Sequence, residues 1–278
     1  MRVLVLGANG QLGSDLVRTS VSEFEVISHK REDWDIRNNS TSYLERVGPD
    51  IIINTTAFHN TEKCEERPHD AFEVNSDAVR KLAEYCKSRN IVLMHVSTDW
   101  VFDGKAKSPY LESSKVGAIN AYGESKLSGE EAIRACHDSH YIVRISSVFG
   151  KFGVGGRGSN FVYTMVKKGL DGKEIRVVDD IVMSPTYTLD AAKTIWSILV
   201  EKRDFGVYHA NNSGECSWFE FANSIIKKIG VDTNVVPINH ASFPTIAERP
   251  MFSAMASEKN TCGRSWERAL SDFLESIE

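Results

Sequence analysis

Three residues in the first half of the sequence have side chains that together could protonate a carbonyl oxygen: Thr98, Tyr122 and Lys126. Tyr122 and Lys126 are four residues apart in a segment of helical spacing, which places both on one helix face. A lysine cation about 4 Å from the phenol would stabilise the phenolate by roughly 4 kcal/mol at an effective dielectric of about 20. We therefore expect Lys126 to lower the pKa of Tyr122 toward neutral pH, where proton transfer is most effective. The Thr98 hydroxyl, which follows an apolar run, can donate a hydrogen bond to the same oxygen.

Glycines near the N-terminus indicate a source of hydride for this chemistry. The apolar run 2–6 leads directly into Gly7, Gly10 and Gly13, and a helical pattern follows. In such a strand–turn–helix, the first glycine permits the tight turn, the second lets the backbone approach a pyrophosphate, and the third allows close packing. The spacing predicts a dinucleotide site. A tight βα turn that holds no ligand is the alternative.

The end of the second predicted strand bears on the choice of cofactor. An NAD-preferring site has an acidic residue near this point, whereas here residues 25–28 are followed by His29, Lys30 and Arg31. Lys30 and Arg31 would suit a 2′-phosphate, so the sequence favours NADPH over NADH. Glu32 and Asp33 follow closely, and two solvated basic side chains on a loop would give the same pattern.

The order of predicted elements indicates the fold. Segments of strand and helix character alternate four times in the first hundred residues. This is typical of an α/β fold with a doubly wound parallel (Rossmann) sheet, whose ligands bind at the carboxyl ends of the strands. We predict an NAD(P)-binding Rossmann domain over residues 1–150 and a smaller C-terminal α/β substrate-binding region over 151–278, with some return crossings to the first domain. The glycine-rich loop 150–158 at the border is either a mobile flap or an insertion without a role.

Composition argues against several classes of protein. The 278 residues include 33 Lys and Arg against 38 Asp and Glu, and the net charge of −5 argues against nucleic-acid binding. The five cysteines are scattered and form no CxxC pair, so we expect neither a disulfide framework nor a metal site. No segment approaches the length of a membrane span or a signal sequence. We expect a cytoplasmic protein that does not bind membranes.

Longer motifs resemble a known family. Segments similar to the dTDP-4-dehydrorhamnose reductase family of extended short-chain dehydrogenases/reductases are 97–104 (STDWVFDG), 120–126 (NAYGESK), 53–57, 63–65, 184–186 and 213–222. Together they cover essentially the whole chain. The resemblance implies NAD(P)H-dependent reduction of the 4-keto group of a dTDP-linked 6-deoxyhexulose, which gives dTDP-L-rhamnose. It implies Tyr122 as the acid, Lys126 as its modulator and ribose anchor, and Thr98 as the hydrogen-bond donor to the carbonyl.

The resemblance also implies residues around the cofactor and the substrate. Those on the cofactor are Gly10, Gln11 and Leu12 at the pyrophosphate, Asp35 and Ile36 at the adenine, and Ala57, Phe58 and His59 on the ribose side. Those on the substrate are Asp99 at the sugar, with Arg249 and Ser253 in an Arg-Pro-x-x-Ser pattern beside the nucleotide sugar. Ser147 stands where the bacterial reductases often have a tryptophan that faces the sugar, and Met255-Ala256 replaces their Leu-Asp or Leu-Asn. The exact sugar is therefore left open. A homodimer is possible, because some relatives bind magnesium at a dimer contact, but no such ligands can be placed in this sequence.

Two other classes of function remain as alternatives. One is a non-catalytic NADP-binding regulatory module such as the β subunit of methionine adenosyltransferase, which resembles the same family. The complete set of Thr98, Tyr122 and Lys126 favours an enzyme. The other is a reductase, epimerase or dehydratase of a different nucleotide sugar. Dehydratases usually carry an acidic pair after the threonine, whereas here Asp99 is followed by Trp100. His95, within the apolar run before Thr98, is interpreted as a core histidine.

Overall fold

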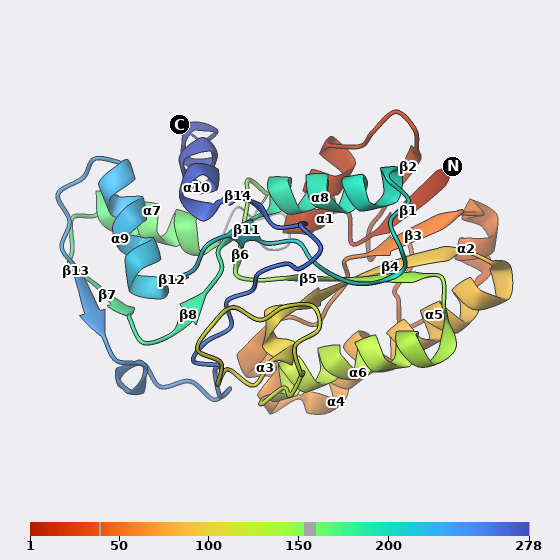
Figure 1. Ribbon diagram of the computed structural model, residues 1–278, viewed down its shortest axis with the longest axis horizontal. Helices are drawn as coiled ribbons and strands as arrows, with labels where there is room; N and C mark the ends of the chain where they lie inside the picture. Colours follow the sequence, from red (N-terminus) through yellow and green to blue (C-terminus); the bar gives the residue numbers. More distant parts are fainter. Residues whose placement is uncertain (39, 153–159, 278) are drawn as a thin grey trace.

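A six-stranded parallel sheet is the centre of the larger part of the molecule (Figure 1). The computed structural model describes residues 1–38, 40–152 and 160–277. The strand order is β10-β5-β4-β3-β1-β2, and every neighbouring pair is parallel. The strands are β1 (Arg2–Leu6), β2 (Glu25–His29), β3 (Ile51–Asn54), β4 (Val92–Thr98), β5 (His140–Ile145) and β10 (Gly206–His209).

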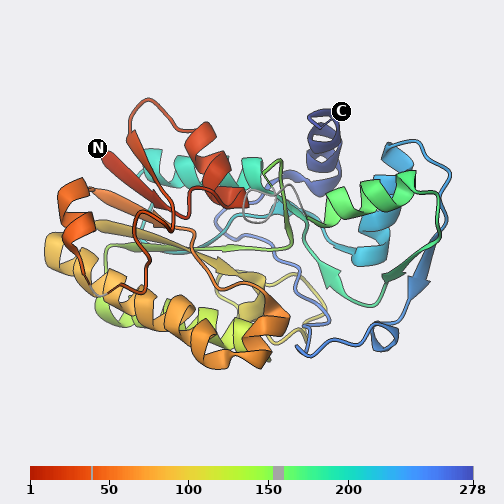
Figure 2. The ribbon, with the colours of Figure 1, turned by 180° about the vertical axis from the view of Figure 1, so that it is seen from behind.

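Helices cover both faces of this sheet (Figures 1 and 2). One face is covered by α1 (Gln11–Arg18) and α8 (Thr188–Val200), and the other by α2 (Ser42–Val47), α5 (Ala78–Arg89) and α6 (Ala121–Cys136). Successive side chains of β1 point to opposite faces of the sheet, and both faces are buried. Val3 and Val5 pack with the α1 and α8 side chains, whereas Leu4 and Leu6 pack with those of α5 and α6. A strand buried on both faces must be apolar throughout. The predicted doubly wound α/β fold is confirmed.

The segment that leads into α5 is helical, although residues 58–68 are mostly polar. It contains α3 (Thr61–Glu66), α4 (Pro68–Phe72) and a π-helical turn, η1 (Glu73–Asp77), that continues into α5. Asn60 caps α3 by accepting from the Lys63 amide at 3.0 Å, and Pro68 begins α4, where a missing N–H has no effect. Asn60 and Pro68 are residues that typically begin helices, and they are the sequence signal for α3 and α4 within this polar segment.

A smaller region lies beside the sheet and has its own apolar core, which includes Phe149, Phe221, Trp266 and Phe273. Its helices are α7 (Phe161–Leu170), α9 (Trp218–Lys228) and α10 (Trp266–Glu275), with 3₁₀ turns η2 (Asp99–Val101) and η4 (His240–Ser242) elsewhere. The short strands form the pairs β6 (Val148–Phe149) with β9 (Thr186–Tyr187), β7 (Ile175–Val178) with β13 (Val235–Ile238), β8 (Val182–Met183) with β12 (Cys216–Ser217), and β11 (Asn212–Ser213) with β14 (Gly263–Ser265).

The second half of the chain also contributes to the sheet layer. Strand β10 and helix α8 come from this half, yet they complete the central sheet and its cover. The division into 1–150 and 151–278 stays a prediction. Residues 153–159, which include most of the glycine-rich loop 150–158, lie outside the described residues, and with them the predicted flap. None of the helices in the described ranges combines the length and apolar character of a membrane span.

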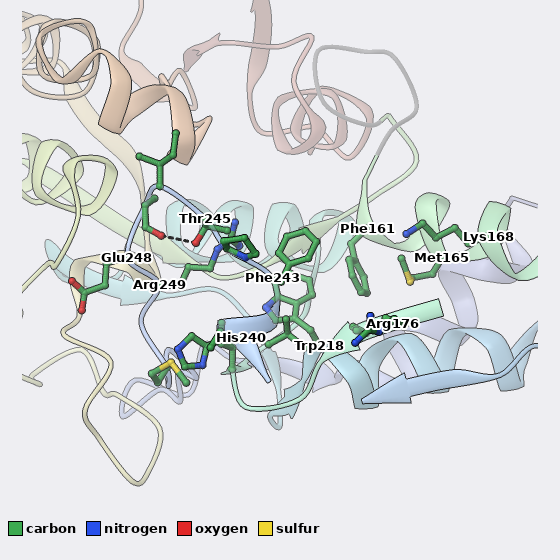
Figure 3. A pocket seen from close by; sticks show the side chains of 18 residues that line it. Phe161, Met165, Lys168, Arg176, Trp218, His240, Phe243, Thr245, Glu248 and Arg249 are labelled. Carbon is green, nitrogen blue, oxygen red and sulfur yellow. Dashed lines mark hydrogen bonds between the residues drawn. The ribbon is translucent and has the colours of Figure 1, made fainter. Parts of the chain in front are cut away.

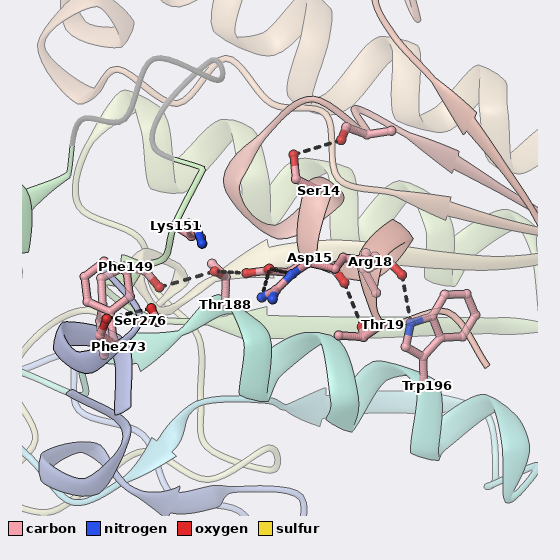
Figure 4. Close-up of polar contacts among 12 residues, drawn as sticks. Ser14, Asp15, Arg18, Thr19, Phe149, Lys151, Thr188, Trp196, Phe273 and Ser276 are labelled. Carbon is pink, nitrogen blue, oxygen red and sulfur yellow. Dashed lines mark hydrogen bonds and ion pairs between the residues drawn. The ribbon is translucent and has the colours of Figure 1, made fainter. Parts of the chain in front are cut away.

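A buried polar contact ties α1, which follows the glycine loop, to α8 (Figure 4). The Thr188 hydroxyl contacts the Asp15 carboxylate at 2.5 Å and the Phe149 carbonyl oxygen at 3.3 Å. The Trp196 indole N–H donates to the Leu16 carbonyl at 3.1 Å. Both Asp15 and Thr188 are fully buried. Helix α1, which follows the glycine loop, is therefore fixed against α8.

Helix α6, which carries Tyr122 and Lys126, lies very close to its neighbours because of two glycines. A Cβ at Gly123 would lie 2.2 Å from the Trp100 carbonyl oxygen, and one at Gly129 would lie 2.2 Å from that of Asn75. The helix is also fixed to β5, because Arg144 donates to the fully buried Glu130 carboxylate at 2.9 and 2.7 Å. These contacts set the depth at which the helix sits.

We predict that Gly129→Ala lowers the free energy of unfolding by about 1–3 kcal/mol, because the added methyl group forces α6 away from η1. Urea denaturation followed by circular dichroism measures this. The control is Glu131→Ala on the exposed face of the same helix, which should stay within about 0.5 kcal/mol of the wild type. Equal stability of the two variants would show that the close approach is not needed.

Candidate active site

A cavity of about 680 Å³ lies at the carboxyl ends of β1, β3 and β4. Most of the predicted site residues line it, although they come from six separate segments: Gly7, Gly10, Gln11, Leu12, Arg31, Asp35, Ile36, Ala57, Phe58, His59, Thr98, Asp99, Tyr122, Lys126 and Ser147. Four predicted residues do not line it, namely Gly13, Lys30, Arg249 and Ser253. The doubly wound topology accounts for the gathering, since parallel strands end at one edge.

The glycine loop has the geometry of a phosphate cradle. Gly7 has a φ of +80°, and a Cβ there would lie 2.7 Å from the Thr55 hydroxyl oxygen. A Cβ at Gly13 would lie 2.2 Å from the Gly7 carbonyl oxygen, so Gly13 serves packing rather than contact with a ligand. Gly10 begins α1 without a side-chain cap. The first amides of α1 are thus available to an anion, which fits the pyrophosphate of a dinucleotide.

The region after β2 differs in detail from the sequence prediction. Arg31 donates to the Asp35 carboxylate at 2.9 Å, and Arg37 donates to it at 2.9 and 2.7 Å. Hydrogen bonds from Arg37 first, and from Arg31, hold the pKa of Asp35 far below its ordinary value. Lys30 lies outside the cavity, while Arg37 lines it. The basic pair at this edge is therefore Arg31 and Arg37. Arg37 was not predicted, because it lies well past the end of β2 in the sequence.

His29 also lines this end of the cavity and was not among the predicted residues. It is 2% exposed, packs edge-on against the rings of Trp34 and Tyr43, and burial lowers its pKa. Within the described part of the chain, neither of its ring nitrogens has a hydrogen-bond partner. In the sequence, only its position at the end of β2 indicates that His29 could lie beside the cavity.

Thr98 and Tyr122 are brought together, as the sequence predicted. The Thr98 side chain acts on the Tyr122 phenol and donates to the Asp99 carboxylate at 3.1 Å. Burial raises the pKa of Tyr122, and the Thr98 contact opposes this only in part. The expectation that the pKa of Tyr122 is lowered is not met in this arrangement, because burial of the phenol is the largest effect and raises that pKa.

The Lys126 amine is instead directed to β4. Its Nζ donates to the Val96 carbonyl oxygen at 2.7 Å and hydrogen-bonds to His95 Nε2 at 3.0 Å. The residue is 1% exposed, and burial lowers the pKa of Lys126 to about 8, against a smaller opposite effect of Glu130. Burial therefore moves the phenol and the amine in opposite directions, and each toward its neutral form.

Asp99 links the cavity to the second half of the chain. The Ser253 and Ser146 hydroxyls donate to one of its carboxylate oxygens at 2.6 and 2.9 Å, and Thr98 donates to the other. Burial raises the pKa of Asp99 to about 6, although the three hydroxyls favour the charged form. Ser253 thus acts through Asp99 and does not reach the cavity itself.

A second cavity of about 760 Å³ adjoins the first, and Trp218 lines both (Figure 3). The Phe161 and Trp218 rings, whose centroids are 4.6 Å apart, line it. Three cations line it, Lys168, Arg176 and Arg249. Aromatic rings beside cations suit a planar base joined to phosphates. The sequence had indicated only Arg249, because the other residues are dispersed over α7, β7 and α9.

Arg249 stands near the border of the two cavities. Its guanidinium lies 5.9 Å from the centre of the Trp100 ring, and one nitrogen is 3.3 Å from the Glu62 carboxylate. Among the described residues, no group of three or more His, Cys, Asp or Glu side chains could hold a metal ion. The donor groups of both cavities instead suit phosphates and a base.

Comparison with known proteins gives a consistent picture. The family model described as the RmlD substrate binding domain matches residues 1–278. The spore coat polysaccharide biosynthesis protein SpsK of Bacillus subtilis is 34% identical over 99% of this chain and 97% of its own length. The dTDP-4-dehydrorhamnose reductase of Sinorhizobium fredii is also 34% identical, over 93% of this chain and 90% of its own.

Solved structures of similar sequence have the same fold throughout. The dTDP-4-dehydrorhamnose reductase of Clostridium acetobutylicum superposes with a TM-score of 0.93 at 33% identity, covering 100% of this chain and 99% of that one. The Bacillus anthracis enzyme of the same name, in complex with NADP, gives 0.93 and 33% over 99% of both chains. The resemblance inferred from the sequence motifs is confirmed. The chain belongs to the dTDP-4-dehydrorhamnose reductase family, a group of extended short-chain dehydrogenases/reductases.

Proposed function

We propose that this protein is an NADPH-dependent reductase of a dTDP-linked 4-keto-6-deoxy sugar, and that its product is dTDP-L-rhamnose. The observation that carries the proposal is that Tyr122, Thr98 and the glycine loop line one cavity, which shares Trp218 with a second cavity lined by aromatic rings and cations. The names of the relatives support the substrate class.

The residues of the chain account for the proton half of the reaction. When bound, the reduced nicotinamide supplies the hydride. Because burial raises the pKa of Tyr122, its hydroxyl is fully protonated at neutral pH and can donate its proton to the carbonyl oxygen of the substrate. Thr98, which acts on that phenol, provides a second polar contact for the same oxygen.

The cofactor is held by the first cavity in this proposal. The first α1 amides, at Gln11 and Leu12, take the pyrophosphate beside Gly10, and Arg31 with Arg37 takes the 2′-phosphate. The Asp35 carboxylate orients both guanidinium groups rather than accepting a ribose hydroxyl, since it is already bonded to them. The relative from Bacillus anthracis forms a complex with NADP.

The nucleotide part of the substrate occupies the second cavity in this proposal. Phe161 and Trp218 bound the base, and Lys168, Arg176 and Arg249 face the diphosphate. The sugar then extends past Trp218 toward Asp99, Ser147 and Tyr122. A second candidate substrate is dTDP-4-keto-6-deoxy-D-glucose, because a reductase of that name from Streptomyces niveus is 37% identical over 83% of this chain and 80% of its own length.

We predict that Tyr122→Phe lowers the rate of NADPH oxidation by about 10²–10⁴-fold, the usual contribution of a general acid. The substitution keeps the ring packed against Trp100 and removes only the hydroxyl. The assay uses a panel of dTDP-linked 4-keto sugars, and NADPH fluorescence measures the affinity for the cofactor, which should stay close to that of the wild type. Tyr85→Phe on α5 is the control. Undiminished turnover in Tyr122→Phe would exclude the catalytic assignment, and a wild type inactive on the whole panel would favour a binding module.

We also predict which basic residue selects the cofactor. Arg31→Ala should weaken NADPH binding by about tenfold, roughly the worth of one charge-assisted hydrogen bond, with little effect on NADH. Lys30→Ala is the matched control and should leave the ratio of the two affinities unchanged, because Lys30 lies outside the cavity. Fluorescence titration with each cofactor measures both. A larger effect from Lys30→Ala would show that the 2′-phosphate binds elsewhere.

A further inference from the structure

A single buried asparagine connects the start of α7 to the start of α1. Asn160, which is 9% exposed, caps α7, and its side-chain oxygen accepts from the Tyr163 backbone N–H at 3.2 Å. Its NH₂ group donates to the Gly150 carbonyl oxygen at 2.8 Å and to the Gln11 side-chain oxygen at 3.2 Å. The first two contacts are local, whereas the third spans 149 residues of sequence and reaches the first residue of α1.

The orientation of the Asn160 amide is fixed by two partners that each have a single role. A backbone N–H can only donate, and a backbone carbonyl oxygen can only accept. The side-chain oxygen of Asn160 must therefore face Tyr163, and its NH₂ group must face Gly150. The second hydrogen of that NH₂ group is the one that reaches Gln11.

The orientation of the Gln11 amide follows from that of Asn160. Because Asn160 donates at this contact, the Gln11 atom that meets it is the oxygen, and a reversed Gln11 amide would place two donors against each other. The NH₂ group of Gln11 therefore points away from Asn160. Among the residues that the structure describes, this NH₂ group has no hydrogen-bond partner. Its two hydrogens are thus left for a ligand, on a side chain that lines the first cavity.

The place of Gln11 in α1 brings this donor beside the phosphate cradle. Gln11 is the first residue of the helix, and helical side chains lean toward the N-terminus of their helix. A long side chain at the first position extends past the start of the helix, where the Gln11 and Leu12 amides have no intrahelical partners. Gly10 offers no side chain to cap these amides. An anion bound there meets two backbone donors and, from the same residue, a side-chain donor.

We propose that Asn160 is a positioning residue that turns the Gln11 NH₂ group toward the pyrophosphate of the cofactor. The inference rests on the proposed function for the location of the cofactor in the first cavity. Without Asn160, the Gln11 amide could take either orientation, and one of the two would direct its oxygen at the negatively charged phosphates. Asn160 removes that unfavourable orientation before the cofactor binds, so less of the binding free energy is lost in ordering the side chain.

The contact also makes the phosphate cradle depend on both halves of the chain. Asn160 stands directly before Phe161 at the start of α7, and the same helix carries Met165 and Lys168. These three α7 side chains line the second cavity. One buried amide therefore caps the helix of the second cavity and completes the set of donors in the first.

A purely structural role for Asn160 is the alternative that the test must exclude. Asn160→Ser keeps a side-chain oxygen that can cap α7 and removes the NH₂ group that holds Gln11. Gln11→Met keeps the length of the side chain and removes both amide atoms. It changes the same contact from the other side, which keeps the test decisive if Asn160→Ser destabilises α7. Asn60→Ser makes the same substitution at the exposed cap of α3 and is the matched control.

The test measures the affinities of the full chain for NADPH and NADH by fluorescence titration. Gln11→Met should weaken both by about tenfold, roughly the worth of one hydrogen bond to a charged group. Asn160→Ser should weaken both by about two- to fivefold, because a free amide holds the competent orientation only part of the time. Both cofactors contain the pyrophosphate, so the ratio of their affinities should not change, unlike the expected effect of Arg31→Ala. Asn60→Ser should bind both as the wild type does.

A double variant and a fragment of the cofactor separate positioning from structure. If Asn160 acts through Gln11, Asn160→Ser should have no further effect on cofactor affinity in the Gln11→Met background. The fragment 2′-AMP has the 2′-phosphate but no pyrophosphate, and in competition titrations it should bind equally well to every variant. An undiminished effect of Asn160→Ser in the Gln11→Met background, or a loss of 2′-AMP affinity as large as that of NADPH, would overturn the proposal.

None of these measurements uses a sugar substrate, so this inference and the proposed function can fail separately. A wild type that binds NADPH, shows the expected losses in the variants and turns over no dTDP-linked sugar would contradict the proposed function alone. A reductase whose cofactor affinity is unchanged in Gln11→Met would contradict this inference alone.

Discussion

The close packing of α6 against β4 and η1 is the constraint on which the site depends. Gly123 lies beneath the Trp100 carbonyl and Gly129 beneath that of Asn75, and neither position has room for a side chain. At this distance the Tyr122 side chain reaches Thr98, and the Lys126 amine reaches the backbone of β4. A helix held even one methyl group further out would leave the amine short of both Val96 and His95. The close approach of the α6 backbone to its neighbours therefore fixes the positions of the side chains in the site.

The same packing removes water from the reactive groups, and desolvation acts on them in opposite senses. It raises the pKa of Tyr122 and lowers that of Lys126, so that each group favours its neutral form. The buried pair of Glu130 and Arg144 shows the other solution, in which two charges are retained because they satisfy each other through two hydrogen bonds. A buried charge in this region is stable only where an oppositely charged side chain is held beside it. A proton donor that is neutral before reaction therefore needs no counterion in the resting protein.

Much of the fold could be predicted from the sequence because the signal is local. The alternation of apolar segments, the glycine spacing and the four-residue interval between Tyr122 and Lys126 are properties of short stretches, and each predicted the correct element.

Lys30 shows where prediction from short stretches fails. Side chains alternate across the end of a strand, and a shift of one position decides whether Lys30 or its neighbours reach the cavity. The predicted lowering of the Tyr122 pKa failed for another reason, since helical spacing gives the face of a helix but not the acceptors on the strand opposite. The second cavity was not visible for a third reason, because its cations lie far apart in the sequence.

Asp99 shows how the two halves of the molecule are joined in one site. Its carboxylate accepts hydroxyl hydrogen bonds from Thr98, from Ser146 just after β5, and from Ser253 in the second half of the chain. Because burial raises its pKa to about 6, the group is charged above that pH and favours its neutral form below it. The charged form is the one that the three hydroxyls stabilise, so at neutral pH the carboxylate holds Ser253 against the end of β4. One buried carboxylate therefore fixes Ser253, two residues beyond the Met251 that lines the second cavity, against the strand end that carries Thr98.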